Sequence, residues 1–216
     1  MDSQVQGDKN ISLCLKDTSG ANNGVEFDSK EATNKPVLEI TYTPAVPTII
    51  DNFDDGDVSG WNSRAGNGGG TVDMSVNSSD KPDGSAYSAN VTFNYGTSAT
   101  WQYRYTEVDG ASWSTKSHNA LRLWFKGDST NGTLASDKLK IQIRESDGDR
   151  WSYNIGNLSE STSWQQITIP FNSMYLDYTG NDGELDLANV TELNIYSNSN
   201  SKTIRMKIDK IEAIKQ

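Results

Sequence analysis

The sequence predicts an all-β fold, an antiparallel β-sandwich of the jelly-roll type, with a short partial β segment at the N-terminus. Many short runs alternate apolar and polar residues with period two, which is the pattern of half-buried strands. Clusters of Gly, Asn, Asp and Ser separate these runs, and helical periodicity is scarce. Apolar residues make up only 34% of the 216 residues, a share that suits short strands joined by long polar loops.

The formal net charge is −10, which argues against a nucleic-acid partner because such proteins present a basic surface. No apolar run approaches the length of a membrane-spanning helix, so we expect no membrane partner. Acidic loops suit calcium, although the charge can equally serve only to keep a secreted domain soluble. A single cysteine, Cys14, excludes an intramolecular disulfide.

The first 43 residues carry three strand-like runs, at 10–16, 24–28 and 36–43. Three strands are few to bury a core of their own, so we interpret residues 1–43 as the C-terminal tail of a preceding domain. Residues 44–48, with Pro44 and Pro47, are predicted to be a linker. The main domain is expected to span 49–216. No signal peptide follows Met1, and we interpret the chain as a piece of a longer protein.

Period-two alternation predicts the strands of the main domain in order. They are 48–53, 71–76, 87–93, 99–107, 119–126, the two arms of a hairpin over 137–155, 164–170, 192–197 and 203–214. A short helical turn is expected over 185–190. In the last strand the apolar parity switches between Ile208 and Ile211, which predicts a β-bulge at Asp209-Lys210.

The hairpin over 137–155 is predicted to turn at Asp147-Gly148, a two-residue loop. Its Leu/Ile positions then face the core. Arg144 would lie opposite Trp151, and Gln142 opposite Tyr153, all four on the outer face with Lys140 at its margin. A bulge or a three-residue loop would instead turn Trp151 and Tyr153 into the core.

A second aromatic set, Trp101, Tyr103 and Tyr105, also recurs with period two. These rings either fill the core or form a second part of the outer face. Gln102 and Arg104, on the opposite side of the strand, are poor core residues, so the pattern leaves both readings open.

Two family resemblances follow from these residues. Residues 27–31 (FDSKE) with Pro36, Leu38, Ile40 and Tyr42 resemble the end of a DNRLRE-type β-sandwich module, although Lys30 stands where that pattern has Arg. From about residue 49 onward the chain resembles the jelly-roll carbohydrate-binding modules of family 11. The matching segments are 51–54 (DNFD), Gly60-Trp61, Trp113, 119–128 (NALRLWFKGD), 141–149 (IQIRESDGD), 164–171 (WQQITIPF) and 208–211 (IDKI).

The second resemblance implies a non-catalytic module of a secreted bacterial enzyme with several domains, which holds its catalytic domain on a polysaccharide. The ligand would be a neutral or weakly charged glycan such as a β-glucan, xylan or mannan. Sugar rings stack on aromatic rings, and their hydroxyls need planar donors and acceptors. The predicted ligand-binding residues are therefore Arg144, Trp151, Tyr153, Gln142, Trp101, Tyr103 and Tyr105.

Asp51, Asp54 and Asp209 are the predicted metal ligands. The first and last strands of a jelly roll often lie side by side, which would bring Asp209 close to the acidic turn after 48–53. The resembled modules hold a structural calcium near these strands, and calcium prefers several carboxylate and carbonyl oxygens. These aspartates alternatively cap turns or face water.

Two other functions remain open. A small polysaccharide lyase or hydrolase on this fold would need a catalytic pair, and the glutamates show no paired spacing within a strand. A structural or adhesion spacer would show no open aromatic face.

Overall fold

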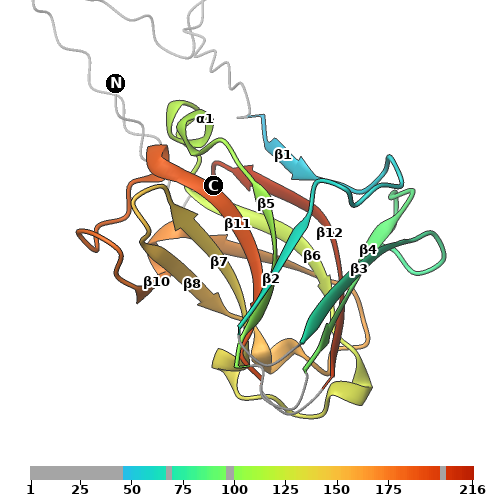
Figure 1. The fold of residues 1–216 in the computed structure, drawn as a ribbon. Helices are drawn as coiled ribbons and strands as arrows, with labels where there is room; N and C mark the ends of the chain where they lie inside the picture. Colours follow the sequence, from blue (N-terminus) through green and yellow to red (C-terminus); the bar gives the residue numbers. More distant parts are fainter. Residues whose placement is uncertain (1–45, 67–69, 96–99, 200–202) are drawn as a thin grey trace, which may run out of the picture. The chain divides into compact units, whose positions relative to one another are not determined.

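The computed structural model describes residues 46–216 except 67–69, 96–99 and 200–202 (Figure 1). The predictions for 1–43 and Cys14, and for Pro44 and Ala45 of the proposed linker, lie outside these residues. The described strands are β1 Thr48–Asp51, β2 Asn62–Ala65, β3 Thr71–Asn77, β4 Ser88–Asn94, β5 Gln102–Glu107, β6 Ala120–Lys126, β7 Leu139–Glu145, β8 Arg150–Asn154, β9 Gln165–Pro170, β10 Tyr175–Tyr178, β11 Val190–Ser197 and β12 Ile204–Ile214. One α-helix, α1, spans Gly110–Thr115, and short 3-10 turns occupy Ser129–Asn131, Ser136–Lys138, Gly156–Leu158, Phe171–Ser173 and Leu187–Asn189.

The predicted antiparallel sandwich is confirmed, because the strands form two six-stranded sheets. Sheet A has the order β3-β4-β12-β6-β9, with β1 beside β12, and sheet B has the order β10-β8-β7-β11-β5-β2. The two sheets form the two layers of Figure 1. The first and last strands lie side by side as expected, with Thr48 opposite Ala213.

The core lies between the sheets and takes alternate side chains from both. Each fully buried aliphatic or aromatic side chain stabilises the fold by about 1.5–3 kcal/mol. Together these side chains hold the two sheets of short strands against each other. The fully buried members include Ala89, Val91, Phe93, Leu121, Phe125 and Ile208 from sheet A, and Leu139 and Ile143 from sheet B.

The predicted bulge in β12 is confirmed. The register with β6 shifts between Asp209 and Glu212, and Lys210 has a φ of 47°. The extra residue keeps Ile208 and Ile211 on the same buried face despite their odd spacing. It also leaves the Asp209 side chain fully buried.

The hairpin has a different register from the predicted one. Ile143 lies opposite Trp151, and Gln142 lies opposite Ser152. Glu145 donates its N–H to the Asp149 carbonyl oxygen at 3.0 Å, so three residues form the loop, with Gly148 at a φ of 107°. A one-residue slip moves every side chain of one strand to the other face.

Trp151 and Tyr153 therefore face the core side, where both pack against the buried cluster. Their predicted place on the outer face is wrong. Arg150, Ser152 and Asn154 occupy it instead, because the longer loop reverses the parity of β8.

Three elements were not predicted: β2, β10 and α1. β2 and β10 are the edge strands of sheet B and are four residues long each. All four side chains of β2 are exposed, so no alternation marks it. β2 and β10 are defined by their hydrogen bonds to β5 and β8. The local sequence does not show that these bonds form.

Candidate functional site

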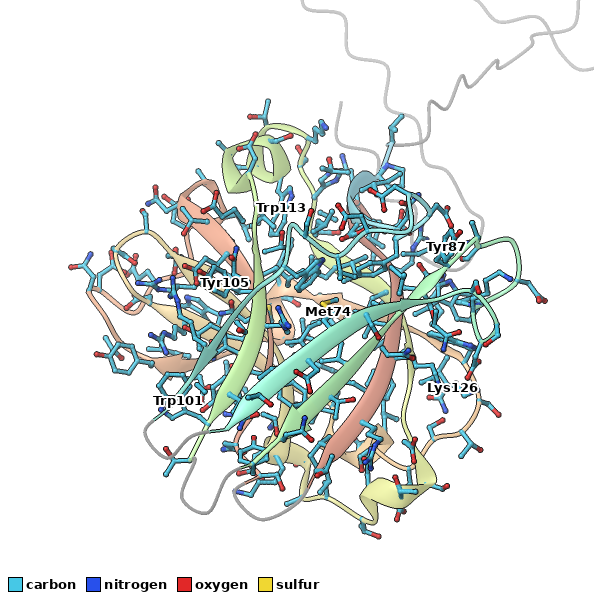
Figure 2. All side chains as sticks on the ribbon, turned by 45° about the vertical axis from the view of Figure 1, so that its right-hand side comes forward. Met74, Tyr87, Trp101, Tyr105, Trp113 and Lys126 are labelled. Atoms are coloured by element: carbon cyan, nitrogen blue, oxygen red, sulfur yellow. The ribbon has the colours of Figure 1, made fainter. Side chains whose placement is uncertain are left out.

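Six aromatic rings share the outer face of sheet B. They are Trp101, Tyr103, Tyr105, Tyr175, Tyr178 and Tyr196, and we call this surface the aromatic face. Figure 2 shows Trp101 and Tyr105 on one side of the sandwich and Lys126 on the other.

The orientation of β5 decides between the two readings left open for its rings. Gln102 and Arg104 point inward, opposite Ser197 and Ile195. Gln102 is fully buried and donates to the Asn94 carbonyl oxygen at 2.8 Å, while Arg104 donates to the Trp61 carbonyl oxygen at 2.9 Å. Backbone carbonyl oxygens thus accept one hydrogen bond from each of the two poor core residues, although Gln102 Oε1 and Arg104 Nε have no partner among the described residues. The three rings therefore point outward.

The rings of β5 and β11 pack into one platform. Trp101 stacks on Tyr103 with centroids 5.6 Å apart and planes 23° from parallel. Tyr103 stacks on Tyr196 at 6.2 Å and 27°. Tyr103 is only 2% exposed, yet it lies outside the core cluster, because its neighbours on the aromatic face cover it. Stacking restricts the movement of these rings, and the half-buried Trp101 and Tyr196 on either side of Tyr103 remain accessible to a ligand.

Asp177 of β10 organises the polar groups at one end of the aromatic face. Lys140 Nζ lies 2.9 Å from both of its carboxylate oxygens, and Gln142 and Ser152 donate to Oδ2 at 3.1 and 3.0 Å. Burial acts to lower the pKa of Lys140, but its contacts with Asp177 and Tyr175 outweigh this and raise the pKa. Lys140 therefore stays charged although it is buried.

Glu192 of β11 organises the other end. Its Oε1 accepts from Arg144 at 2.9 Å and lies 3.5 Å from Arg64. Arg64 also donates to the hydroxyls of Tyr103 and Tyr105, at 3.3 and 3.2 Å. The ion pair and the phenols hold these groups in place before any ligand arrives.

Four buried polar atoms of this face have no hydrogen-bond partner among the described residues. They are Arg144 Nε, Arg150 Nε, Glu192 Oε2 and Asn194 Oδ1. Leaving a buried polar group unsatisfied costs about 1–3 kcal/mol. Two donors and two acceptors in one patch match the mixed hydrogen-bonding capacity of hydroxyl groups.

Of the predicted ligand-binding residues, Trp101, Tyr103, Tyr105, Gln142 and Arg144 thus share one face. The groups of β2 and β10 were missed with their strands, as was Arg150 with the hairpin register. Glu192, Asn194 and Tyr196 could have been found, since Leu193 and Ile195 alternate with them in a predicted strand.

The three predicted metal ligands are only partly brought together. Asp51 accepts from the Phe53 N–H at 2.8 Å and from Trp61 Nε1 at 2.7 Å, so both its oxygens have donors. Burial raises the pKa of Asp209, and the negative charge of Asp54 nearby also raises it. Asp209 Oδ2 and Ser85 Oγ are buried without a partner, which suits a hard cation.

A second acidic group, Glu145, Asp147 and Asp149, brings carboxylate oxygens within 4.8 Å of one another and could hold a metal. These oxygens already have donors, however. Asp149 accepts from the backbone N–H groups of Gly180, Asn181 and Gly183. The bond from Asn181 contributes most to lowering the pKa of Asp149, and the bonds from Gly180 and Gly183 lower it further. The group joins the hairpin loop to the segment that follows β10.

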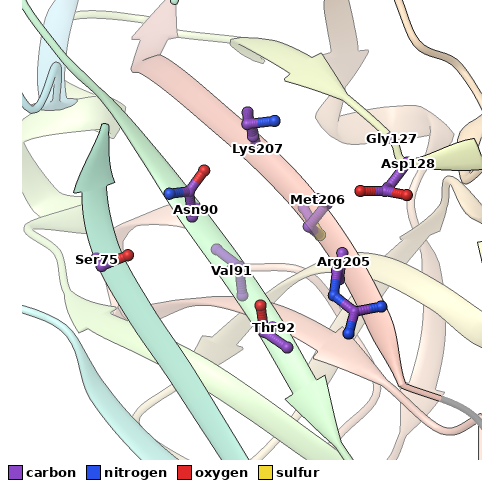
Figure 3. Close-up of a pocket in the computed structure, with 9 residues that line it drawn as sticks. All are labelled: Ser75, Asn90, Val91, Thr92, Gly127, Asp128, Arg205, Met206 and Lys207. Atoms are coloured by element: carbon purple, nitrogen blue, oxygen red, sulfur yellow. The ribbon is translucent and has the colours of Figure 1, made fainter. Parts of the chain in front are cut away.

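The outer face of sheet A carries a groove of about 220 Å³ (Figure 3). Its lining includes Ser75, Asn90, Arg205 and Lys207, with no aromatic ring. Beside it, Asp80 accepts from Lys126 at 2.8 Å and pairs with Lys207 at 2.9 Å. The groove therefore lacks the stacking surface that distinguishes sheet B.

No α-helix in the described part of the chain is long and apolar enough to cross a membrane.

The model of the carbohydrate binding domain of family 11 matches residues 38–216. No protein with a curated function matches the chain.

Among solved structures, the family 11 module of a cellulosomal cellulase of Clostridium thermocellum is 22% identical, with a TM-score of 0.61; the match covers 81% of this chain and 97% of that one. A family 11 module of the same organism, in complex with a β-1,3-1,4-mixed-linked tetrasaccharide, is also 22% identical, at a TM-score of 0.61 and coverages of 78% and 95%. A family 30 carbohydrate binding module is 18% identical, with a TM-score of 0.55 and coverages of 79% and 99%.

Proposed function

Because this chain belongs to the carbohydrate binding domains of family 11, we propose that its aromatic face binds a polysaccharide and performs no chemistry on it. The observation that carries the proposal is the open ring platform with two unpaired donors and two unpaired acceptors beside it. Ring faces would stack on the C–H faces of sugars, and the guanidinium and carboxylate groups that border the rings would bind sugar hydroxyls.

We propose a β-glucan as the ligand, ahead of xylan and mannan. A fold neighbour was solved with a β-1,3-1,4-mixed-linked tetrasaccharide, and an extended row of rings over β5 and β11 suits a flat, extended chain. Stacking and a few hydrogen bonds typically give micromolar binding, about −8 kcal/mol at 1 μM.

The carboxylates of the aromatic face favour binding over catalysis. Glycoside hydrolysis needs one carboxylic acid and one carboxylate at a set separation. Asp177 forms an ion pair with Lys140, and Glu192 forms one with Arg144, so both carboxylates already have a cationic partner within the face. A hydrolase or lyase on this fold would release oligosaccharides from the bound glycan.

The natural setting that we propose is a secreted bacterial enzyme of several domains, with this module holding a catalytic domain on its substrate. The cellulase module among the fold neighbours supports this setting. We further propose a structural calcium ion held by the Asp209 carboxylate and Ser85 Oγ. Asp54 accepts from the Ala86 N–H and from Asn52 Nδ2, and Asp51 accepts from Phe53 and Trp61, so these two aspartates hold the acidic turn beside the ion. The buried and unpaired Asp209 Oδ2 supports this assignment.

Affinity electrophoresis and calorimetry with mixed-linkage β-glucan, xylan and mannan test the function. We expect retention on β-glucan without release of reducing ends, and loss of retention in Trp101→Ala. Trp124→Ala is the matched control, because Trp124 is a tryptophan of β6 in sheet A and so is not part of the aromatic face of sheet B. An equal loss of glycan affinity in the two variants, or no retention of the parent chain on any glycan, would contradict the proposal.

A further inference from the structure

The aromatic face gathers cations in a chain that is acidic overall. The formal net charge is −10, yet Arg64, Lys140, Arg144 and Arg150 all lie on this one face. The carboxylates there are Asp177, Glu192 and, at the end of β5, Glu107. The aromatic face therefore has more cationic than anionic side chains, although the whole chain has a negative net charge.

Arg144 and Arg150 lie directly opposite each other on β7 and β8. Like charges at opposed positions destabilise a sheet, so this pairing is unfavourable for folding alone. Glu192 offsets it only in part, because its Oε1 serves both Arg144 at 2.9 Å and Arg64 at 3.5 Å.

Arg150 has no carboxylate partner among the described residues. Its guanidinium lies over the ring of Tyr178, 5.2 Å from the centroid, and Tyr178 is 58% exposed. The Nε atoms of Arg150 and Arg144 are both buried without an acceptor. The Nη groups of Arg150 have no hydrogen-bond or ion-pair partner among the described residues, and they lie next to Arg144 and to an exposed ring.

We propose that Arg144 and Arg150 bind the carboxylate of an acidic sugar, a uronate carried by the polysaccharide that the aromatic face holds. The guanidinium fork matches a carboxylate in two parallel hydrogen bonds, and Tyr178 can stack on the same sugar ring. This inference rests on the proposed function and narrows its ligand from glycans in general to uronate-bearing ones.

Matched glycans that differ only in carboxylate content test the inference. The first pair is mixed-linkage β-glucan and the same glucan partly oxidised at C6; the second is glucuronoxylan and its carboxyl-reduced form. For at least one pair we expect about tenfold tighter binding of the carboxylated member at low salt. The ratio should shrink in 0.5 M NaCl, where the Debye length is about 4 Å.

Substitutions assign the effect to the two arginines. In Arg150→Gln the ratio of affinities should fall to about one, while Arg150→Lys, which keeps the charge without the fork, should give an intermediate ratio. Arg205→Gln is the control, because it removes the same charge from the outer face of sheet A and should leave the ratio near ten. Thermal unfolding verifies that each variant is folded.

Three results would overturn the inference, and they are distinguishable. If neutral members bind and their carboxylated partners bind no tighter, the uronate site is wrong and the polysaccharide-binding function stands. If neither member of either pair binds, both are wrong. An equal fall of the ratio in Arg205→Gln would assign the effect to overall charge and would also overturn the site.

Discussion

Trp151 offers the sharpest test of the structure, because the two possible hairpin registers predict opposite phenotypes for its removal. In the observed register its ring packs on the core cluster, and its Nε1 donates to Glu145 Oε2 at 2.7 Å. Trp151→Ala should therefore destabilise the fold and leave glycan affinity nearly unchanged in the folded fraction. A ring on the outer face would give the reverse.

The magnitude follows from the two contacts. An aromatic side chain buries about 150–250 Å², and the lower figure at about 25 cal/mol per Å² corresponds to about 4 kcal/mol. Loss of a hydrogen bond to a charged group adds about 1.5–3 kcal/mol. Such areas are upper estimates, so we expect a loss of about 3–5 kcal/mol in the free energy of unfolding, as is usual for truncating a packed tryptophan.

Urea unfolding, followed by circular dichroism, measures this loss. Trp151→Phe separates the contributions, since it keeps most of the apolar contact and removes the donor to Glu145; we expect a loss of about 1.5–3 kcal/mol. Trp101→Ala is the comparison on the aromatic face, with a loss below about 1 kcal/mol. A Trp151→Ala variant that unfolds at the parent urea concentration but no longer binds β-glucan would refute the register and the site built on it.

Three further predictions follow from other contacts. Tyr196→Ala should weaken β-glucan binding about 5–30-fold in calorimetry, since Tyr196 is a half-buried ring of the aromatic face and truncating a central interface ring costs about 1–2 kcal/mol; unchanged affinity would place the ligand elsewhere. EDTA should lower the melting temperature by about 5–10 °C in the parent chain but not in Asp209→Asn, if calcium is bound at about 100 times its dissociation constant; an identical response in both would exclude Asp209 as a ligand. The third concerns Asp80, whose pKa burial acts to raise but hydrogen bonds from Lys126, Lys207 and Trp164 bring down to about 2. This stabilisation is full above the unfolded pKa of 3.8 and is lost as the pH falls towards 2. Asp80→Asn should thus cost about 1–2 kcal/mol at pH 7, allowing for a side chain that is 31% exposed, and the difference from the parent should vanish near pH 2; a gap that persists there would contradict the assignment.

The sequence by itself determined the strand content and much of its detail. Period-two alternation located most strands of both sheets, and the parity switch between Ile208 and Ile211 located the bulge at Asp209-Lys210. These signals are local, because a residue facing an apolar core must be apolar wherever the neighbouring strands lie. The antiparallel sandwich followed from them without knowledge of which strands pair.

Only the tertiary structure decided which side of each strand the ligand meets. Alternation separates the two faces of a strand but does not show which face is buried. Tyr103 and Trp151 have the same alternating pattern, yet Tyr103 lies on the outer face and Trp151 faces the core. One additional loop residue between β7 and β8 turned Trp151 inward, and backbone acceptors elsewhere in the chain allowed Gln102 to be buried so that Tyr103 points outward. The edge strands β2 and β10, which supply Arg64, Asp177 and Tyr178, exist through hydrogen bonds to partners distant in sequence. Which face of a strand is exposed, which strands pair and which strands form the edges all depend on such long-range contacts. For that reason the aromatic face could be identified only in the folded structure.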